Sequence, residues 1–184
     1  SCSELLNRPN RNVLLYSQLL RIGTDPEKVI AFRNSRDECT TKLVISEVAL
    51  QKAEEANRMS DLQLKLQEAT VPIARSKIKK IVEEIIDNAF KFSLANTPVK
   101  ITTNFQNNFF HLFVIDRGQG MSSEQIANLG AYLQFDPIQE MQGFGLGLTI
   151  AKLLIELYAG NLSIESTPGA YTAVPVTLPT ESGD

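Results

Sequence analysis

The helix predicted for residues 78–93 places three different functional groups on one line. Glu84, Asn88 and Lys91 are spaced i, i+4 and i+7, so a carboxylate, an amide and an ammonium lie on one side of the helix. Taken alone, this helix is most simply interpreted as having a solvated flank, because polar residues usually border a buried stripe. The apolar stripe beside them repeats at helical spacing and comprises Ile78, Ile81, Val82, Ile85, Ile86 and Ala89.

Two glycine-rich segments downstream could form a ligand site together with these polar groups. The first spans residues 116–121 and begins at Asp116, where a strand is predicted to end. Glycines there let the backbone approach a ligand, and the carboxylate can accept a hydrogen bond from an exocyclic amine. The second spans residues 143–148 and reads Gly-x-Gly-x-Gly. It runs directly into a predicted helix, whose free N–H groups and positive end favour phosphate.

Either glycine segment alone could be a flexible connector or a turn. The second is not a Walker A loop, because no Gly-Lys-Ser/Thr follows it. The strand–turn–helix order of a dinucleotide-binding fingerprint is also missing. The interpretation as a nucleotide site therefore depends on both segments together with the preceding helix.

Composition limits the classes of function. The chain has 184 residues with 43% hydrophobic and 21% charged residues, which is ordinary for a soluble globular protein. A net charge of −3 argues against nucleic acid as the main partner. No apolar run reaches the roughly 18 residues that a membrane span needs. Cys2 and Cys39 lack metal-ligand spacing, so we expect a reducing cytoplasm rather than a disulfide framework.

The order of predicted elements indicates an α+β fold. We expect a two-layer sandwich in which three helices cover one face of a mixed, mostly antiparallel sheet, with an additional helical segment at the N-terminus. Asp25 and Ser76 are the predicted N-caps of two of the helices. The predicted helices span residues 3–22, 26 onward, 40–58, 78–93, 122–129 and 147–158, and the predicted strands span 62–66, 71–74, 99–105, 109–116, 161–166 and 171–178.

In combination, the motifs resemble the ATP-binding domain of sensor histidine kinases, the HATPase or GHKL group with the Bergerat fold. The resemblance covers about residues 43–179, including the ending 160–179, and is greatest to kinases in which a receiver domain precedes the kinase core. Three boxes carry it: Asn88-Ala-Phe-Lys-Phe-Ser93 is similar to the N box, Asp116-x-Gly118-x-Gly120 to the first glycine box, and Gly143-x-Gly145-Leu-Gly147-Leu148 to the second.

The resemblance implies roles for individual residues. Asn88 would hold Mg²⁺, Lys91 would reach the ATP phosphates, and Glu84 would orient or activate the attacking group, which makes these three the catalytic set. Asp116 would bind the adenine amine, and Thr172 would reach adenine through water, although Tyr171 stands where the family often has glycine. The implied nucleotide-binding residues are Asn88, Lys91, Asp116, Gly118, Gly120, Met121, Gly143, Phe144, Gly145, Leu146, Gly147, Leu148 and Thr172.

The resemblance also implies an ATP lid and partners. Residues 119–142 would form the lid, with Phe135 as the remnant of its aromatic box. The expected partners are ATP, a phosphoacceptor hairpin of the same or a partner protomer and a response regulator. The full-length protein is expected to be a homodimer.

The phosphoacceptor histidine of such kinases is missing from this sequence. The single histidine, His111, lies within a predicted strand, where a structural role is the expected one. We therefore expect residues 1–38 to be the remnant of the dimerisation and phosphoacceptor hairpin, 39–180 to be the ATP-binding domain and 181–184 to be a tail.

Two alternatives stay open at this point. The chain could belong to a nucleotide-binding pseudokinase, or to a gyrase- or Hsp90-type ATPase in which Glu84 activates water. The sequence leaves undecided whether Glu84 works on a histidine, on water or on neither.

Overall fold

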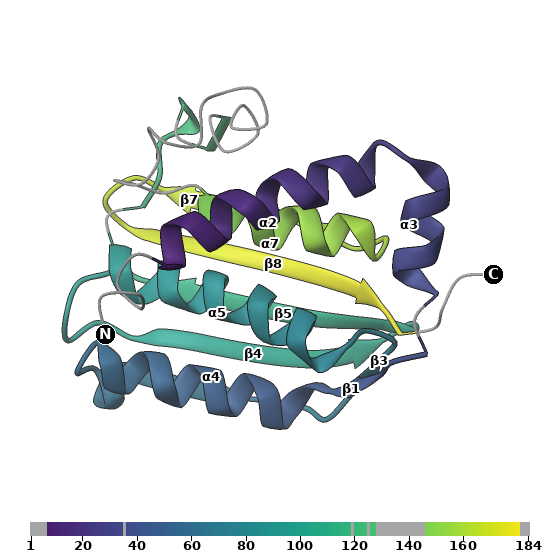
Figure 1. Cartoon of the computed structure of the whole chain (residues 1–184). Coiled ribbons are helices and arrows are strands. Elements are labelled where there is room, and N and C mark those ends of the chain that lie inside the picture. Colours follow the sequence, from purple (N-terminus) through teal and green to yellow (C-terminus); the bar gives the residue numbers. More distant parts are fainter. Residues whose placement is uncertain (1–6, 35, 119, 125, 128–145, 181–184) are drawn as a thin grey trace.

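A six-stranded sheet with helices on one face forms the body of the protein (Figure 1). The computed structural model describes residues 7–34, 36–118, 120–124, 126–127 and 146–180. Strand β2 (Leu62–Lys65) pairs in parallel with β4 (Val99–Gln106), and every other pair in this sheet is antiparallel. The sheet order is β2-β4-β5-β8-β6, with β5 (Phe109–Asp116), β8 (Tyr171–Pro179) and β6 (Asn161–Leu162), while β7 (Glu165–Thr167) also pairs with β8.

Three helices cover one face of the sheet, as the sequence predicts. They are α4 (Thr41–Glu55), α5 (Arg75–Phe92) and α7 (Leu146–Leu157), which lie side by side in Figure 1. The N-terminal helix α2 (Asn7–Gly23) packs against α7, and α3 (Pro26–Arg33) follows it. The mixed, mostly antiparallel α/β sandwich is therefore confirmed, with an N-terminal helical segment added to it.

The stripe predicted on α5 forms the centre of the core. All six of its apolar residues are buried, with exposed fractions of 3% or less. The sequence of α4 predicts one apolar face formed by Leu43, Val44, Val48, Ala49 and Ala53. The structure buries all of these except Leu43, which is 59% exposed. Ile45 is buried in its place because the sheet-facing side of α4 is centred on positions 41, 45, 48 and 52.

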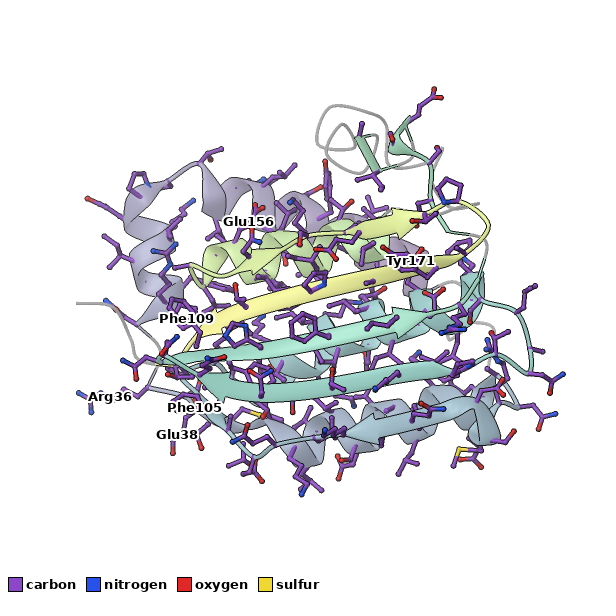
Figure 2. All side chains as sticks on the ribbon, turned by 180° about the vertical axis from the view of Figure 1, so that it is seen from behind. Arg36, Glu38, Phe105, Phe109, Glu156 and Tyr171 are labelled. Atoms are coloured by element: carbon purple, nitrogen blue, oxygen red, sulfur yellow. The ribbon has the colours of Figure 1, made fainter. Side chains whose placement is uncertain are left out.

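The central hairpin sets the orientation of the strand that carries Asp116. The sequence predicts that Asn107 and Asn108 join these two strands. Both have positive φ, at 55° and 64°, as a two-residue turn between twisted strands requires. The side chains of β5 alternate, so that Asp116 points to the helical layer together with Phe110, while Phe109 and His111 lie on the opposite face. No helix of the described residues covers that face, and Phe109 and Tyr171 are exposed on it (Figure 2).

Several local predictions are corrected by the structure. Asp25 caps α3, accepting a hydrogen bond from the Glu27 N–H at 3.0 Å, but Ser76 does not cap α5. Helix α5 begins at Arg75, because the Ala74 carbonyl already accepts from the N–H groups of residues 77 and 78. The strand predicted over residues 71–74 is only β3 (Thr70–Val71), which pairs with β1 (Cys39–Thr40) outside the main sheet.

Three further predictions concern the part of the chain after residue 121. The strand predicted over residues 161–166 is divided into β6 and β7, and both parts pair with β8. Of the short helix predicted at 122–129, residues 123, 124, 126 and 127 are helical. The predicted tail, 181–184, lies outside the described residues.

A buried arginine fixes the C-terminal end of α5. Arg58 is 7% exposed and lies just before the short 3₁₀ helix η1 (Met59–Asp61). Its guanidinium donates to Asp61 Oδ2 at 2.7 Å and to the carbonyls of Phe90, Leu94 and Thr97 at 2.8–3.0 Å. A cation at this place satisfies carbonyls that helical bonding leaves free.

We predict that Arg58→Ala lowers the free energy of unfolding by about 3–5 kcal/mol, because it leaves Asp61 and several carbonyls buried without their cation. Urea denaturation followed by circular dichroism measures this loss. The matched control is Arg75→Ala, which removes an exposed pair with Glu47 and should cost less than about 1 kcal/mol. Equal losses in the two variants would contradict the role assigned to Arg58.

Candidate functional site

The three polar residues of α5 lie at increasing exposure along the helix. Glu84 is buried at 5% exposure, Asn88 is half-buried and Lys91 is exposed. Lys91 places its ammonium 5.3 Å from the ring centre of Phe92. The line predicted from their spacing therefore runs from the core to the surface, and a ligand at its outer end can meet the amide and the ammonium directly.

Glu84 meets the start of α7, where the second glycine segment ends. A Cβ atom added at Gly147 would lie 2.1 Å from Glu84 Oε2, so the carboxylate occupies the space that a side chain would need. The other carboxylate oxygen, Oε1, accepts from Lys80 Nζ at 2.7 Å. The structure thus brings Glu84 and Gly147 together from elements about 60 residues apart in the chain.

A second carboxylate is buried at the far end of the site. Asp116 is 5% exposed, and burial raises its pKa from 3.8 to about 7, while the charge of Arg58 acts in the opposite direction. Its register partner across β8 is Thr172, which is 6% exposed. Asp116 and Thr172 therefore lie side by side beneath the helical layer, and the adenine-binding role that the family resemblance implies for them stays a prediction.

Ser166 is a member of this group that the sequence analysis missed. Its hydroxyl donates to the Tyr171 carbonyl at 2.8 Å, lies 2.9 Å from Thr172 Oγ1 and accepts the Met121 N–H at 2.5 Å. It thereby ties the first glycine segment to β8. Strand pairing places Ser166 opposite Thr172, but that register is apparent only once β7 is recognised as a separate strand.

The glycines of the first segment are required by packing of backbone on backbone. A Cβ at Gly118 would lie 2.5 Å from the Phe92 carbonyl oxygen. At Gly120, where φ is +65°, a Cβ would lie 2.2 Å from the Thr167 carbonyl oxygen. These two positions bring the turn after β5 against the end of α5 and against the β7–β8 turn.

The remaining predicted residues divide into two groups. Met121, Leu146 and Leu148 are buried apolar side chains of the core, so only their backbone could face a nucleotide. Gly143, Phe144, Gly145 and Phe135, with most of the predicted lid, lie outside the described residues.

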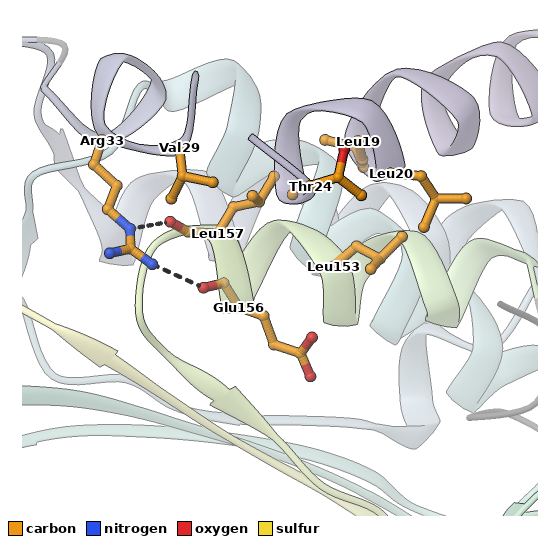
Figure 3. Close-up of a pocket in the computed structure, with 9 residues that line it drawn as sticks. Leu19, Leu20, Thr24, Val29, Arg33, Leu153, Glu156 and Leu157 are labelled. Atoms are coloured by element: carbon orange, nitrogen blue, oxygen red, sulfur yellow. Dashed lines mark hydrogen bonds between the residues drawn. The ribbon is translucent and has the colours of Figure 1, made fainter. Parts of the chain in front are cut away.

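The largely apolar cavity in Figure 3 is separate from this site. It has a volume of about 460 Å³ and lies where α2 and α3 meet α7. Arg33 closes one side by donating to the Leu157 and Glu156 carbonyls. None of the predicted site residues that the structure describes lines it; its lining residues are Leu19, Leu20, Gly23, Thr24, Val29, Arg33, Leu153, Glu156 and Leu157.

The described residues contain no cluster of three or more His, Cys, Asp or Glu side chains able to hold a metal ion. None of the helices in the described part of the chain combines the length and the apolar character that crossing a bilayer demands.

A mixed sheet with one helical face, two buried carboxylates and a glycine segment leading into α7 defines a nucleotide-binding α/β sandwich. Residues 74–182 match the histidine kinase-, DNA gyrase B- and HSP90-like ATPases, and the chain belongs to this family. The resemblance to sensor histidine kinases is confirmed as well: the chain contains an ATP-binding domain of that type.

Individual relatives agree with this assignment. Histidine protein kinase DivJ of Caulobacter vibrioides is 35% identical over 114 residues, which are 61% of this chain and 19% of DivJ. The methanogenesis regulatory histidine kinase FilI of Methanothrix harundinacea is 28% identical over 174 residues, 91% of this chain and 19% of FilI. This chain thus spans about a fifth of the length of these curated relatives.

A solved histidine kinase structure shares the fold. Acinetobacter baumannii AdeS superposes with a TM-score of 0.69 at 18% identity, covering 97% of this chain and 80% of that chain. The superposition therefore includes the N-terminal helical segment as well as the sandwich.

The raised pKa of Asp116 predicts a pH dependence of stability. Between pH 3.8 and about 7 the folded chain binds a proton that the unfolded chain does not, so the free energy of unfolding falls as the pH rises through this window. In Asp116→Asn this contribution is absent. Urea denaturation at several pH values from 4 to 8 should show the wild type losing stability relative to the variant, and parallel pH profiles would contradict the prediction.

Proposed function

We propose that this chain is the catalytic part of a protein histidine kinase, which transfers the γ-phosphoryl group of ATP to a histidine on a helical hairpin outside the chain. The observation that carries the proposal is the meeting of Glu84 with Gly147 at the start of α7. A phosphate at the N-terminal end of α7 would lie near a carboxylate that can orient the attacking group.

The adenine end of the site rests on Asp116. Its carboxylate would accept the hydrogen bond of the exocyclic amine, while Thr172 beside it would reach the ring through water. An N–H donor stabilises the ionised carboxylate and so opposes the burial that raises its pKa. Because the acidic group is buried, it selects for a ligand that brings a donor.

Magnesium fits the residues that face the phosphate end. Mg²⁺ is commonly held by one or two protein oxygens together with phosphate oxygens and water. The half-buried Asn88 supplies one amide oxygen, one helical turn beyond Glu84. When bound, the ion would neutralise phosphate charge; Lys91 would add a second cation, and the α7 backbone would donate N–H groups.

The wider assignment follows from the same proposal. Residues 1–38 would derive from the dimerisation and phosphoacceptor hairpin and 39–180 would form the ATP-binding domain of a cytoplasmic homodimer that passes phosphate to a response regulator. The alignment with FilI, which covers 91% of this chain, supports a shared N-terminal segment.

Two substitutions test the separate roles of the carboxylates. Asp116→Asn should weaken binding of Mg²⁺ and a non-hydrolysable ATP analogue at least about tenfold, because it removes a charge-assisted hydrogen bond. Glu84→Gln should leave that affinity within about threefold but lower histidine labelling by about 100-fold. Calorimetry measures the affinity, and radiolabelled ATP with the acceptor hairpin supplied measures transfer.

Glu83→Gln is the matched control, since Glu83 lies on α5 beside Glu84 and pairs with Lys79 at 3.8 Å. It should behave as the wild type in both assays. Steady ATP hydrolysis without the hairpin would favour a gyrase- or Hsp90-type ATPase instead. Nucleotide binding without any labelling would favour a pseudokinase.

A further inference from the structure

Lys80 connects the N-terminal helix to the buried carboxylate of the candidate site. Its ammonium donates to Glu84 Oε1 at 2.7 Å and to Asn12 Oδ1, also at 2.7 Å. Glu84 lies one turn further along α5, whereas Asn12 belongs to α2. One cation therefore joins two helices that are 68 residues apart at this contact.

The two oxygens of the Glu84 carboxylate have different surroundings. Lys80 binds Oε1, and Oε2 fills the space next to Gly147. A movement of Lys80 would therefore rotate or displace the carboxylate with respect to the first turn of α7. The contacts form a continuous path from α2 through α5 to the proposed phosphate end.

The position of Asn12 depends on how α2 packs. Asn12 is 9% exposed, and Tyr16 and Leu19, one and two turns further on, are 5% and 2% exposed in the same core as α5 and α7. Helix α2 packs against α7 (Figure 1). If α2 shifted or turned on α7, the amide oxygen would leave Lys80.

We propose that Lys80 is a positioning residue for Glu84 and that Asn12 makes this position depend on the packing of α2. The N-terminal helix thereby sets the rate of phosphoryl transfer through one side-chain relay. This inference rests on the proposed function, because it needs Glu84 to act in the transfer step. Lys80 acts through Glu84, so its loss should affect the transfer rate much more than nucleotide affinity.

The test uses the full-length kinase, including its acceptor helix, with radiolabelled ATP and Mg²⁺. Lys80→Met should lower the labelling rate at saturating ATP about tenfold, as expected for a misplaced group, with the nucleotide Kd changed less than about threefold. Lys80→Arg keeps a cation and two or more donors, so it should recover most of the rate. Asn12→Ala should lower the rate about threefold through loss of one hydrogen bond.

A double variant tests the relay itself. If Asn12 acts through Lys80, then Asn12→Ala should have no further effect in the Lys80→Met background. Lys79→Met and Gln18→Ala are matched controls on the exposed sides of α5 and α2 and should label as the wild type. Thermal unfolding by circular dichroism confirms that each variant is folded.

The outcomes separate this inference from the function on which it rests. Wild-type labelling rates in Lys80→Met, or additive losses in the double variant, overturn the relay and leave the kinase function intact. Failure of Lys80→Arg to recover activity in a folded protein also overturns it. A wild-type protein that binds no nucleotide, or binds it and never labels, overturns the proposed function and the relay with it.

Discussion

The burial of the Glu84 carboxylate between α5 and the start of α7 is the constraint on which the candidate site depends. A buried charge is costly unless it is paired, and Lys80 supplies the pairing at 2.7 Å. The space for the carboxylate exists because Gly147 has no side chain. The residue type at the first turn of α7 is therefore dictated by a side chain of α5, independently of any contact that a glycine makes with phosphate.

A second buried carboxylate has a different environment. Burial of Asp116 raises its pKa to about 7, and the charge of Arg58 lowers it only in part. Arg58 also binds the carbonyls at the end of α5, so one cation both secures that helix and lowers the pKa of Asp116. The protein thus holds the Glu84 carboxylate in an ion pair with Lys80 at the start of α7, whereas the Asp116 carboxylate is buried with a raised pKa.

Local patterns were sufficient to predict most of the fold. The stripe of α5, the Asn107-Asn108 turn and the cap at Asp25 all depend on interactions within a few residues, and the structure has each of them. The comparisons confirm the family that the three boxes indicated. The structure also brings Glu84, one turn before the N box, close to Gly147 of the second glycine box. The roles of these two residues stay predictions.

The contacts that the sequence does not predict are those between residues far apart in the chain. The sequence predicts Arg58 as the last residue of a helix, but its guanidinium binds carbonyls 32 to 39 positions further along the chain. Ser166 needed the strand register, and the contact of Asn12 with Lys80 needed the packing of α2 on α7. The predictions for Leu43 and Ser76 are wrong because a shift of one residue changes which side of a helix is buried or where the helix begins.

The carboxyl ¹³C chemical shift of Asp116, followed from pH 5 to 8, tests most directly whether this is a nucleotide site. Without ligand the titration midpoint should lie near 7, because burial raises the pKa. With Mg²⁺ and a non-hydrolysable ATP analogue bound, donation from the adenine amine should lower the midpoint by about one unit or more. A midpoint that stays unchanged when the nucleotide is bound would contradict the placement of adenine at Asp116.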